Sequence, residues 1–104
     1  MERFEVKTPL WRWQSATAPA AWYFLTIAGA AADGIRLAAM SGQWLDKRGG
    51  FGSARVEAAI GDTIWKTSVF PHRESGGWLL PVKAAVRKAE GLVEGDDVTV
   101  RVSL

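Results

Sequence analysis

Residues 79–98, L-L-P-V-K-A-A-V-R-K-A-E-G-L-V-E-G-D-D-V, hold the end of a strand, a helix, a turn and the start of another strand. Pro81 can end the strand and open the helix, because the first position of a helix needs no backbone N–H. The next apolar residues recur at helical spacing and form one stripe: Val82, Ala85, Val86 and Ala89. Gly91 suits the left-handed position after a helix, and Leu92 can supply the apolar contact of a Schellman motif. The stretch therefore predicts a helix that lies flat on a core and ends at a glycine.

A tight turn and a final strand follow this helix. Gly95 and Asp96 are residue types that form tight turns. Beyond the turn, apolar and polar residues alternate up to Leu104. This period of two predicts a half-buried strand over residues 98–104.

The remainder of the chain predicts further strands and one more helix. Strands are expected over residues 4–13, 22–27, 53–60, 63–70 and 78–81, and a helix over residues 30–40. Gly61 and Asp62 form a two-residue hairpin signal between two of these strands. Pro71 is expected to end a strand, and Gly42 to stop the first helix.

An internal repeat indicates how these elements assemble. Each half has a Trp followed by a basic residue, then the end of a strand, then a helix with an outward Arg. The equivalent residues of the two halves are Trp11 and Trp65, Ile27 and Leu80, and Arg36 and Arg87. We therefore expect two β-β-α-β halves, about residues 1–60 and 61–104. A single half cannot close its sheet edges, whereas two halves can. The predicted fold is mainly β: one domain forming a closed six-stranded double-split β-barrel with two helices.

The stretch from Leu80 to Val98 also fits the pattern L-P-x(5)-R-x(3)-G-x(3)-G-D-x-V. This pattern resembles the strand, helix, turn and strand unit of the AbrB and MazE-like swapped-hairpin regulators and antitoxins. Two short chains each contribute a half-barrel in that superfamily. The resemblance implies that one chain here does what two regulator chains do together, and it raises DNA binding as a hypothesis.

Three segments carry a closer resemblance. They are G-F-G-S-x-R-V-E-A-x-I-G at residues 50–61, W-K-T-S-V-F-P at residues 65–71 and L-P-V-K-A-A-V-R at residues 80–87. Together they resemble the bacterial family catalogued as domain of unknown function 1905. This resemblance implies a small double-split β-barrel and leaves the biochemistry open.

Length and composition agree with a single small domain. The chain has 104 residues, no cysteine and a net charge of +2, so disulfides and thiolate metal sites are excluded. Residues 14–32 carry no charge, but Pro19, Gly29 and several hydroxyls favour a loop and a strand over a membrane span. We expect a cytoplasmic protein without a membrane segment. Because both halves reside in one chain, it is also expected to be a monomer.

Three features could be mistaken for catalytic or ligand sites. The glycine-rich segment 48–52 precedes a strand, whereas phosphate-cradling loops open a helix. Ser68 and His72 lack the surroundings of a nucleophile elbow. Asp96 and Asp97 lack the spaced ligand set of a calcium loop. The sequence therefore predicts no catalytic residue, metal or cofactor.

Tryptophan is the most informative residue type for function. The six are Trp11, Trp13, Trp22, Trp44, Trp65 and Trp78. Large aromatics can fill the core of a small barrel whose helices contain mostly Ala and Val. Alternatively, Trp11 and Trp13 share one face of their strand, with Arg12 on the other, and could form a stacking platform for bases, sugars or a flat small molecule.

Charged residues suggest a second candidate surface. The pseudo-symmetry could bring together Arg36, Lys83, Arg87 and Lys88, although solvated helix faces explain these residues better. Acidic residues are interspersed with the basic ones, which disfavours phosphate binding. The leading hypothesis is a non-enzymatic binding or interaction module with a protein or small-molecule partner. The alternatives are an AbrB-like nucleic-acid-binding regulator, and a small-molecule binder or enzyme with a Trp-lined cleft between the halves.

Overall fold

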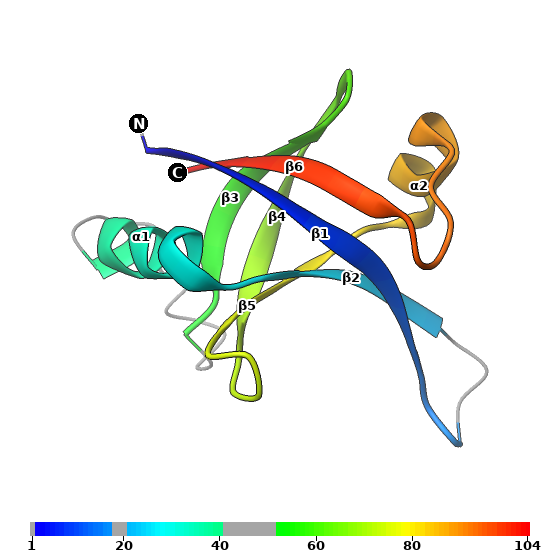
Figure 1. Cartoon of the computed structure of the whole chain (residues 1–104), viewed down its shortest axis with the longest axis horizontal. Helices are drawn as coiled ribbons and strands as arrows, with labels where there is room; N and C mark the ends of the chain where they lie inside the picture. The colour runs from blue at the N-terminus through cyan, green and yellow to red at the C-terminus, as the bar shows by residue number, and fades with distance from the viewer. Residues whose placement is uncertain (1, 18–20, 41–51) are drawn as a thin grey trace.

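The computed structural model describes residues 2–17, 21–40 and 52–104. Within these residues the chain forms six strands and two helices (Figure 1). Their bounds are β1 (Arg3–Gln14), β2 (Ala21–Ile27), α1 (Gly29–Met40), β3 (Ala54–Ile60), β4 (Thr63–His72), β5 (Gly77–Pro81), α2 (Ala84–Glu90) and β6 (Asp97–Ser103). The helices follow the second and fifth strands, as predicted. The features predicted at Gly42, at Trp44 and over most of segment 48–52 lie outside the described residues.

The strands close into an antiparallel barrel in the order β1-β2-β5-β4-β3-β6. This confirms the predicted fold class, a mainly β, closed six-stranded barrel with two helices. The pairing of the first half recurs in the second, since β1 pairs with β2 and β6 while β4 pairs with β5 and β3. Superposition of the two halves, about residues 1–60 and 61–104, stays a prediction.

Both long strands change partner along their length. β1 pairs with β6 through residues 3–9 and with β2 through residues 10–14. β4 pairs with β3 through residues 63–69 and with β5 through residues 70–72. Neighbouring strands therefore separate at two places in the barrel wall. The helices lie beside these places, α1 in contact with β1 and α2 in contact with β4.

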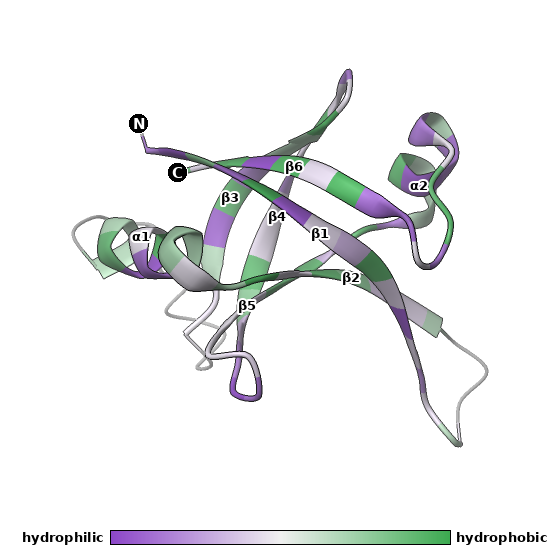
Figure 2. Ribbon diagram, viewed as in Figure 1, coloured by the Kyte–Doolittle hydropathy of each residue, from purple (hydrophilic) through white to green (hydrophobic). Residues whose placement is uncertain are grey.

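The barrel interior is filled by the inward residues of every strand. Hydrophobic and polar bands alternate along β1 and β6 in Figure 2, as expected for strands with one buried face. The largest fully buried side chains are Leu10, Leu25, Ile27, Ile35, Val69, Leu80, Val86, Val100 and Val102. α1 buries Ala32, Ile35 and Ala39, whereas α2 buries only Val86. The second helix therefore contributes less to the core than the first.

Close packing explains the glycine inside α1. A Cβ atom added to Gly34 would lie 2.7 Å from Cζ of Phe4, so the missing side chain lets β1 approach the helix. A glycine in a helix interior costs roughly 0.5–1 kcal/mol relative to alanine, and the contact with Phe4 offsets that cost. Among the described helices, neither is long and apolar enough to cross a membrane.

Two proline predictions were wrong. Pro81 ends β5 but does not open α2, which begins at Ala84. The Val82 N–H donates to the Tyr23 carbonyl at 2.9 Å, and this bond continues the pairing past Pro81 and delays the helix. Pro71 lies inside β4 and pairs with β5 alone, since β3 pairs no further along β4 than Val69. A proline is tolerated where one edge of a strand has no partner.

The predicted helix stop and turn are confirmed. Gly91 has a φ of 64°, and the Leu92 N–H donates to the Arg87 carbonyl at 2.9 Å, which is the bond of a Schellman motif. Gly95 has a φ of 93°, and the Asp96 carboxylate accepts the Val93 N–H at 2.9 Å. The turn is fixed to β1, because the Gly95 N–H donates to the Leu10 carbonyl at 2.8 Å.

Candidate functional site

Four aromatic side chains lie on one outward face of the β1–β2 hairpin. Trp11 pairs with Phe24, and Trp13 pairs with Trp22, so the four point to the same side of the ribbon. The neighbouring pair, Leu10 and Leu25, points inward and is buried. Trp13 is 49% exposed and Trp22 is 55% exposed. We call the set Trp11, Trp13, Trp22 and Phe24 the aromatic face.

Trp11 is the anchored member of the aromatic face. Its indole Nε1–H donates to Oγ1 of Thr26 at 2.8 Å. Its ring centroid lies 5.2 Å from that of Phe24, with the rings tilted by 39°, and 6.4 Å from that of His72. These contacts fix the orientation of the indole before any ligand arrives, which lowers the entropy lost on binding.

The aromatic face borders a shallow depression of about 560 Å³. Besides the four aromatic residues, its lining includes Leu79, His72 and Glu74. The two polar residues come from the end of β4 and the turn after it, so they stand at the edge of an apolar surface. Such a combination of apolar area and a few polar groups is typical of small-molecule sites.

Exposed apolar surface continues from the aromatic face across β4 and β5. Phe70 is 42% exposed and pairs with Leu79. A second depression of about 820 Å³ contains Phe70, Trp22 and Pro81, and is bordered by Arg55 and Lys66. Phe70 therefore extends the exposed aromatic surface beyond the β1–β2 hairpin.

The tryptophans divide between the core and the surface. Trp65 is 8% exposed and Trp78 is 4% exposed, so these two fill the barrel. Trp13 and Trp22 are exposed and Trp11 is half-buried, so the three together supply most of the aromatic face. Arg12 lies on the opposite side of β1 and donates a hydrogen bond to Oε1 of Gln14 at 2.6 Å.

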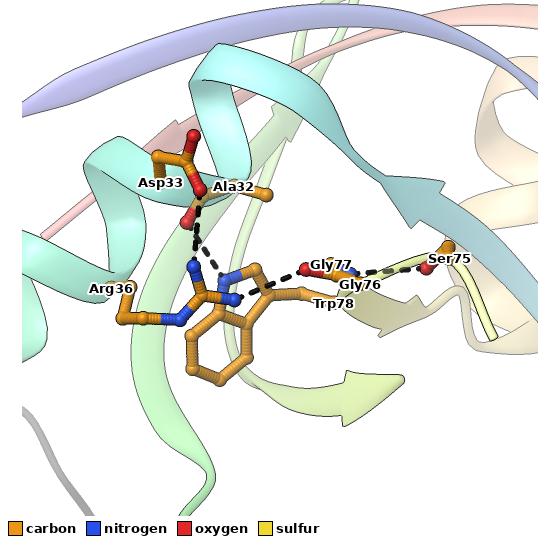
Figure 3. A network of polar contacts seen from close by, with 7 residues as sticks. All are labelled: Ala32, Asp33, Arg36, Ser75, Gly76, Gly77 and Trp78. Atoms are coloured by element: carbon orange, nitrogen blue, oxygen red, sulfur yellow. Dashed lines mark hydrogen bonds and ion pairs between the residues drawn. The ribbon is translucent and has the colours of Figure 1, made fainter. Parts of the chain in front are cut away.

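The candidate cations do not form one surface. α1 and α2 lie on opposite sides of the barrel (Figure 1), so Arg36 is separated from Lys83, Arg87 and Lys88. Figure 3 shows that Arg36 joins α1 to the β4–β5 turn, donating to Asp33 Oδ1 and to the Gly76 carbonyl, each at 3.1 Å. This bonding gives Arg36 a structural role.

Trp78 belongs to the same structural network. Its Nε1–H donates to the Ala32 carbonyl at 3.1 Å (Figure 3). The bond joins the buried indole of β5 to the first turns of α1, so the Trp78 N–H has a partner although it is buried. The network therefore fixes the first helix to the barrel rather than serving a ligand.

At α2, Arg87 differs from Lys88 in the same helix and from Lys83 just before it. Lys83 and Lys88 are exposed, whereas Arg87 is half-buried. The guanidinium carbon of Arg87 lies 3.8 Å from the centroid of the Tyr23 ring, which is a cation–π contact. The Nη1 atom of Arg87 is buried and has no hydrogen-bond partner among the described residues.

The partners of His72 differ from those of a nucleophile and base pair. The His72 imidazole shares a hydrogen bond with Ser75 Oγ at 2.8 Å through Nδ1, and its Nε2 lies 4.0 Å from a Glu74 carboxylate oxygen. His72 therefore bonds to a neighbouring turn residue instead of Ser68. Among the residues that the structure describes, no three His, Cys, Asp or Glu side chains come together to hold a metal.

Sequence reasoning identified Trp11 and Trp13 but missed their partners across the hairpin. Trp22 and Phe24 are two positions apart in β2. Because side chains alternate between the two faces of a strand, their shared face could have been inferred from the sequence. Their position opposite Trp13 and Trp11 depends on the register of the β1–β2 hairpin, and the loop between the strands carries no two-residue turn signal that fixes it.

Comparison with known proteins identifies the family of the chain. No curated protein matches the chain. A family model described as "Domain of unknown function (DUF1905)" matches residues 7–102. These residues run from β1 to β6 and so span the closed barrel. The chain therefore belongs to the DUF1905 family.

Proposed function

We propose that the chain is a non-enzymatic binding module that holds a neutral ring-shaped ligand of the carbohydrate class on its aromatic face. The observation that supports this function is the exposure of Trp13 and Trp22 as a cross-strand pair next to the anchored Trp11. The C–H groups of a sugar ring carry partial positive charge and pack against the negative face of an indole. A sheet with adjacent indoles presents such faces side by side.

The polar groups at the edge of the aromatic face also suit a sugar. His72 and Glu74 line the same depression as the indoles. An imidazole and a carboxylate can exchange hydrogen bonds with hydroxyl groups, which donate and accept. The Glu74 side chain is exposed, so binding a hydroxyl there requires little desolvation.

The charges at this depression disfavour nucleic acid as the ligand. Among the described residues, its lining contains the acid Glu74 and no lysine or arginine. Proteins that stack single-stranded bases combine aromatic platforms with a positively charged groove for the phosphates. A neutral ring ligand does not need a positively charged groove.

The test is an NMR titration with neutral oligosaccharides of glucose, xylose, mannose and N-acetylglucosamine, compared with a single-stranded oligonucleotide. We expect sugar-dependent shifts of the Trp11 and Trp13 indole N–H signals. Trp13→Ala should weaken binding by about fivefold or more, because one stacking contact is worth roughly 1–3 kcal/mol. Ile64→Ala is the matched control, since Ile64 is 62% exposed and is not part of the depression lining.

Two results would contradict the proposal. One is the absence of shifts at the indole signals with every sugar of the panel at millimolar concentration. The other is binding to the oligonucleotide alone, with an affinity that falls steeply as salt rises. The second outcome would instead favour the nucleic-acid alternative.

A further inference from the structure

We propose that the place where β2 and β4 separate is a second binding site, specific for a small aromatic carboxylate. Residues 63–69 of β4 pair with β3 along one edge of the strand. Along the opposite edge, no strand within the described residues pairs with them, because β5 pairs only with residues 70–72. Ala21 and Trp22 of β2 pair with β1, and among the described residues no strand pairs with them on the β5 side. The carbonyl of the next residue, Tyr23, accepts the Val82 N–H just past the end of β5. The start of α2 closes the gap between the two edges. We call this site the split groove.

The split groove has the size and walls of a ligand site. Its volume is about 400 Å³, which lies within the range of roughly 300–1,000 Å³ found for small-molecule pockets. Trp22, Tyr23 and Trp65 line it. Trp65 is largely buried and gives the groove a rigid wall, whereas Trp22 is exposed at its mouth.

Arg87 supplies the strongest indication of an anionic ligand. Its guanidinium lies over the Tyr23 ring at 3.8 Å and lines the groove. The buried Nη1 atom donates no hydrogen bond, and no acidic side chain among the described residues forms an ion pair with Arg87. A buried, unsatisfied donor on a charged group is unfavourable. A small rotation of the guanidinium would allow it to donate to a bound carboxylate.

The other charges of the groove have the same sign. Lys66 and Lys83 line it together with Arg87, and in the part of the chain that the structure describes no Asp or Glu belongs to the lining. The overall net charge of +2 is small, so the positive character is local to this groove. The depression beside the aromatic face has the opposite character, because it contains Glu74.

The shape of the cation and its surroundings select the ligand class. A planar guanidinium binds a carboxylate through two parallel hydrogen bonds. The adjacent aromatic walls provide apolar contact for a ring attached to that carboxylate. An inorganic anion would use the charge but none of the aromatic surface. The complementary ligand is therefore an aromatic carboxylate.

The split groove is independent of the proposed sugar-binding face. Of the four residues of the aromatic face, Trp22 alone also lines the split groove, because Trp11, Trp13 and Phe24 are not part of that lining. A variant of Trp13 and a variant of Arg87 therefore test the two sites separately. Failure of either proposal leaves the other intact.

The experiment is an NMR titration of the full chain with benzoate and indole-3-acetate. We expect both to shift the Trp65 indole N–H and the Arg87 Nε–H signals. Benzamide, the neutral analogue of benzoate, should bind at least about tenfold more weakly, because it cannot form the charged pair. Arg87→Gln should reduce benzoate affinity by about tenfold or more. Lys88→Gln is the matched control, since Lys88 is exposed on the same helix and is not part of the groove lining.

The fold of each variant is checked by thermal unfolding. Should Arg87→Gln fail to fold, Lys66→Gln and Lys83→Gln provide the test, because both side chains are exposed and line the groove; the double variant should still weaken benzoate binding severalfold. Equal binding of benzoate and benzamide would overturn the proposal, as would equal binding of benzoate and inorganic phosphate. Benzoate affinity that is unchanged in folded Arg87→Gln would also overturn it.

Discussion

Gly77→Ala gives a sharp test of how tightly the barrel is packed. Gly77 begins β5 and is buried. A Cβ atom added there would overlap the Ile27 carbonyl oxygen, and would lie 2.9 Å from the Ile27 carbonyl carbon and 3.1 Å from Ala28 Cα. All three are backbone atoms, so no side-chain rotation can relieve the overlap. β2 and β5 must move apart where Ile27 pairs with Trp78.

The expected cost follows from that geometry. Overpacking that forces backbone shifts costs typically about 1–3 kcal/mol, so Gly77→Ala should lower the free energy of unfolding by about 2–3 kcal/mol. Gly76→Ala is the matched control. Gly76 has a φ of 71° with nothing within 4 Å of an added Cβ. An alanine in the left-handed conformation costs about 1–2 kcal/mol. About 0.4–1 kcal/mol of this is offset, because alanine lowers the conformational entropy of the unfolded chain. Its net loss should be about 0.5–1 kcal/mol.

Urea denaturation and thermal unfolding measure the two variants. A loss of 1 kcal/mol lowers the Tm of a domain of this size by roughly 4–8 °C. Gly77→Ala should therefore lower Tm by about 10–20 °C and Gly76→Ala by about 5 °C. Equal effects of the two substitutions, or a Gly77→Ala variant as stable as the parent chain, would refute the close approach of β2 and β5.

Further predictions concern the helix stop, assembly and DNA. Gly91→Ala should lower the free energy of unfolding by about 1 kcal/mol, because Gly91 has a φ of 64°; an unchanged urea midpoint would contradict the Schellman motif. Because the barrel closes within one chain, sedimentation velocity across a dilution series should find a monomer, and an obligate dimer would show that strands exchange between chains. Duplex DNA should not bind at physiological salt, since Arg36 lies apart from the α2 cations; steeply salt-dependent binding that Arg87→Glu abolishes would reverse this expectation.

Much of the fold could be predicted because its signals are local. The helix stop at Gly91 and the turn at Gly95 each depend on a residue that tolerates positive φ. The Gly61–Asp62 hairpin signal correctly placed the turn between β3 and β4. The proline predictions failed because the consequence of a proline depends on which strand lies beside it, and that partner is a tertiary property. Pro71 stays in β4 since one of its edges is unpaired there.

The candidate sites could be predicted only in part. The sequence placed Trp11 and Trp13 on one face of a strand by alternation alone. It could not show that Trp65 and Trp78 fill the core while Trp13 and Trp22 are exposed, because six similar residues carry no burial signal of their own. It also suggested a cationic surface that would join Arg36 to α2, whereas the barrel places the two helices on opposite sides.

The sequence by itself determined the elements of this protein: alternating strands, two short helices, the glycine stop of α2 and the tight turns at Gly61 and Gly95. These features follow from backbone preferences and from hydrophobic periods that act over a few residues. Only the tertiary structure decided the surfaces. The register of the β1–β2 hairpin sets Trp22 opposite Trp13, and the change of partner along β4 opens the groove in which Arg87 meets Tyr23. Such surfaces combine residues far apart in the chain, so their composition depends on strand pairing that no local pattern specifies.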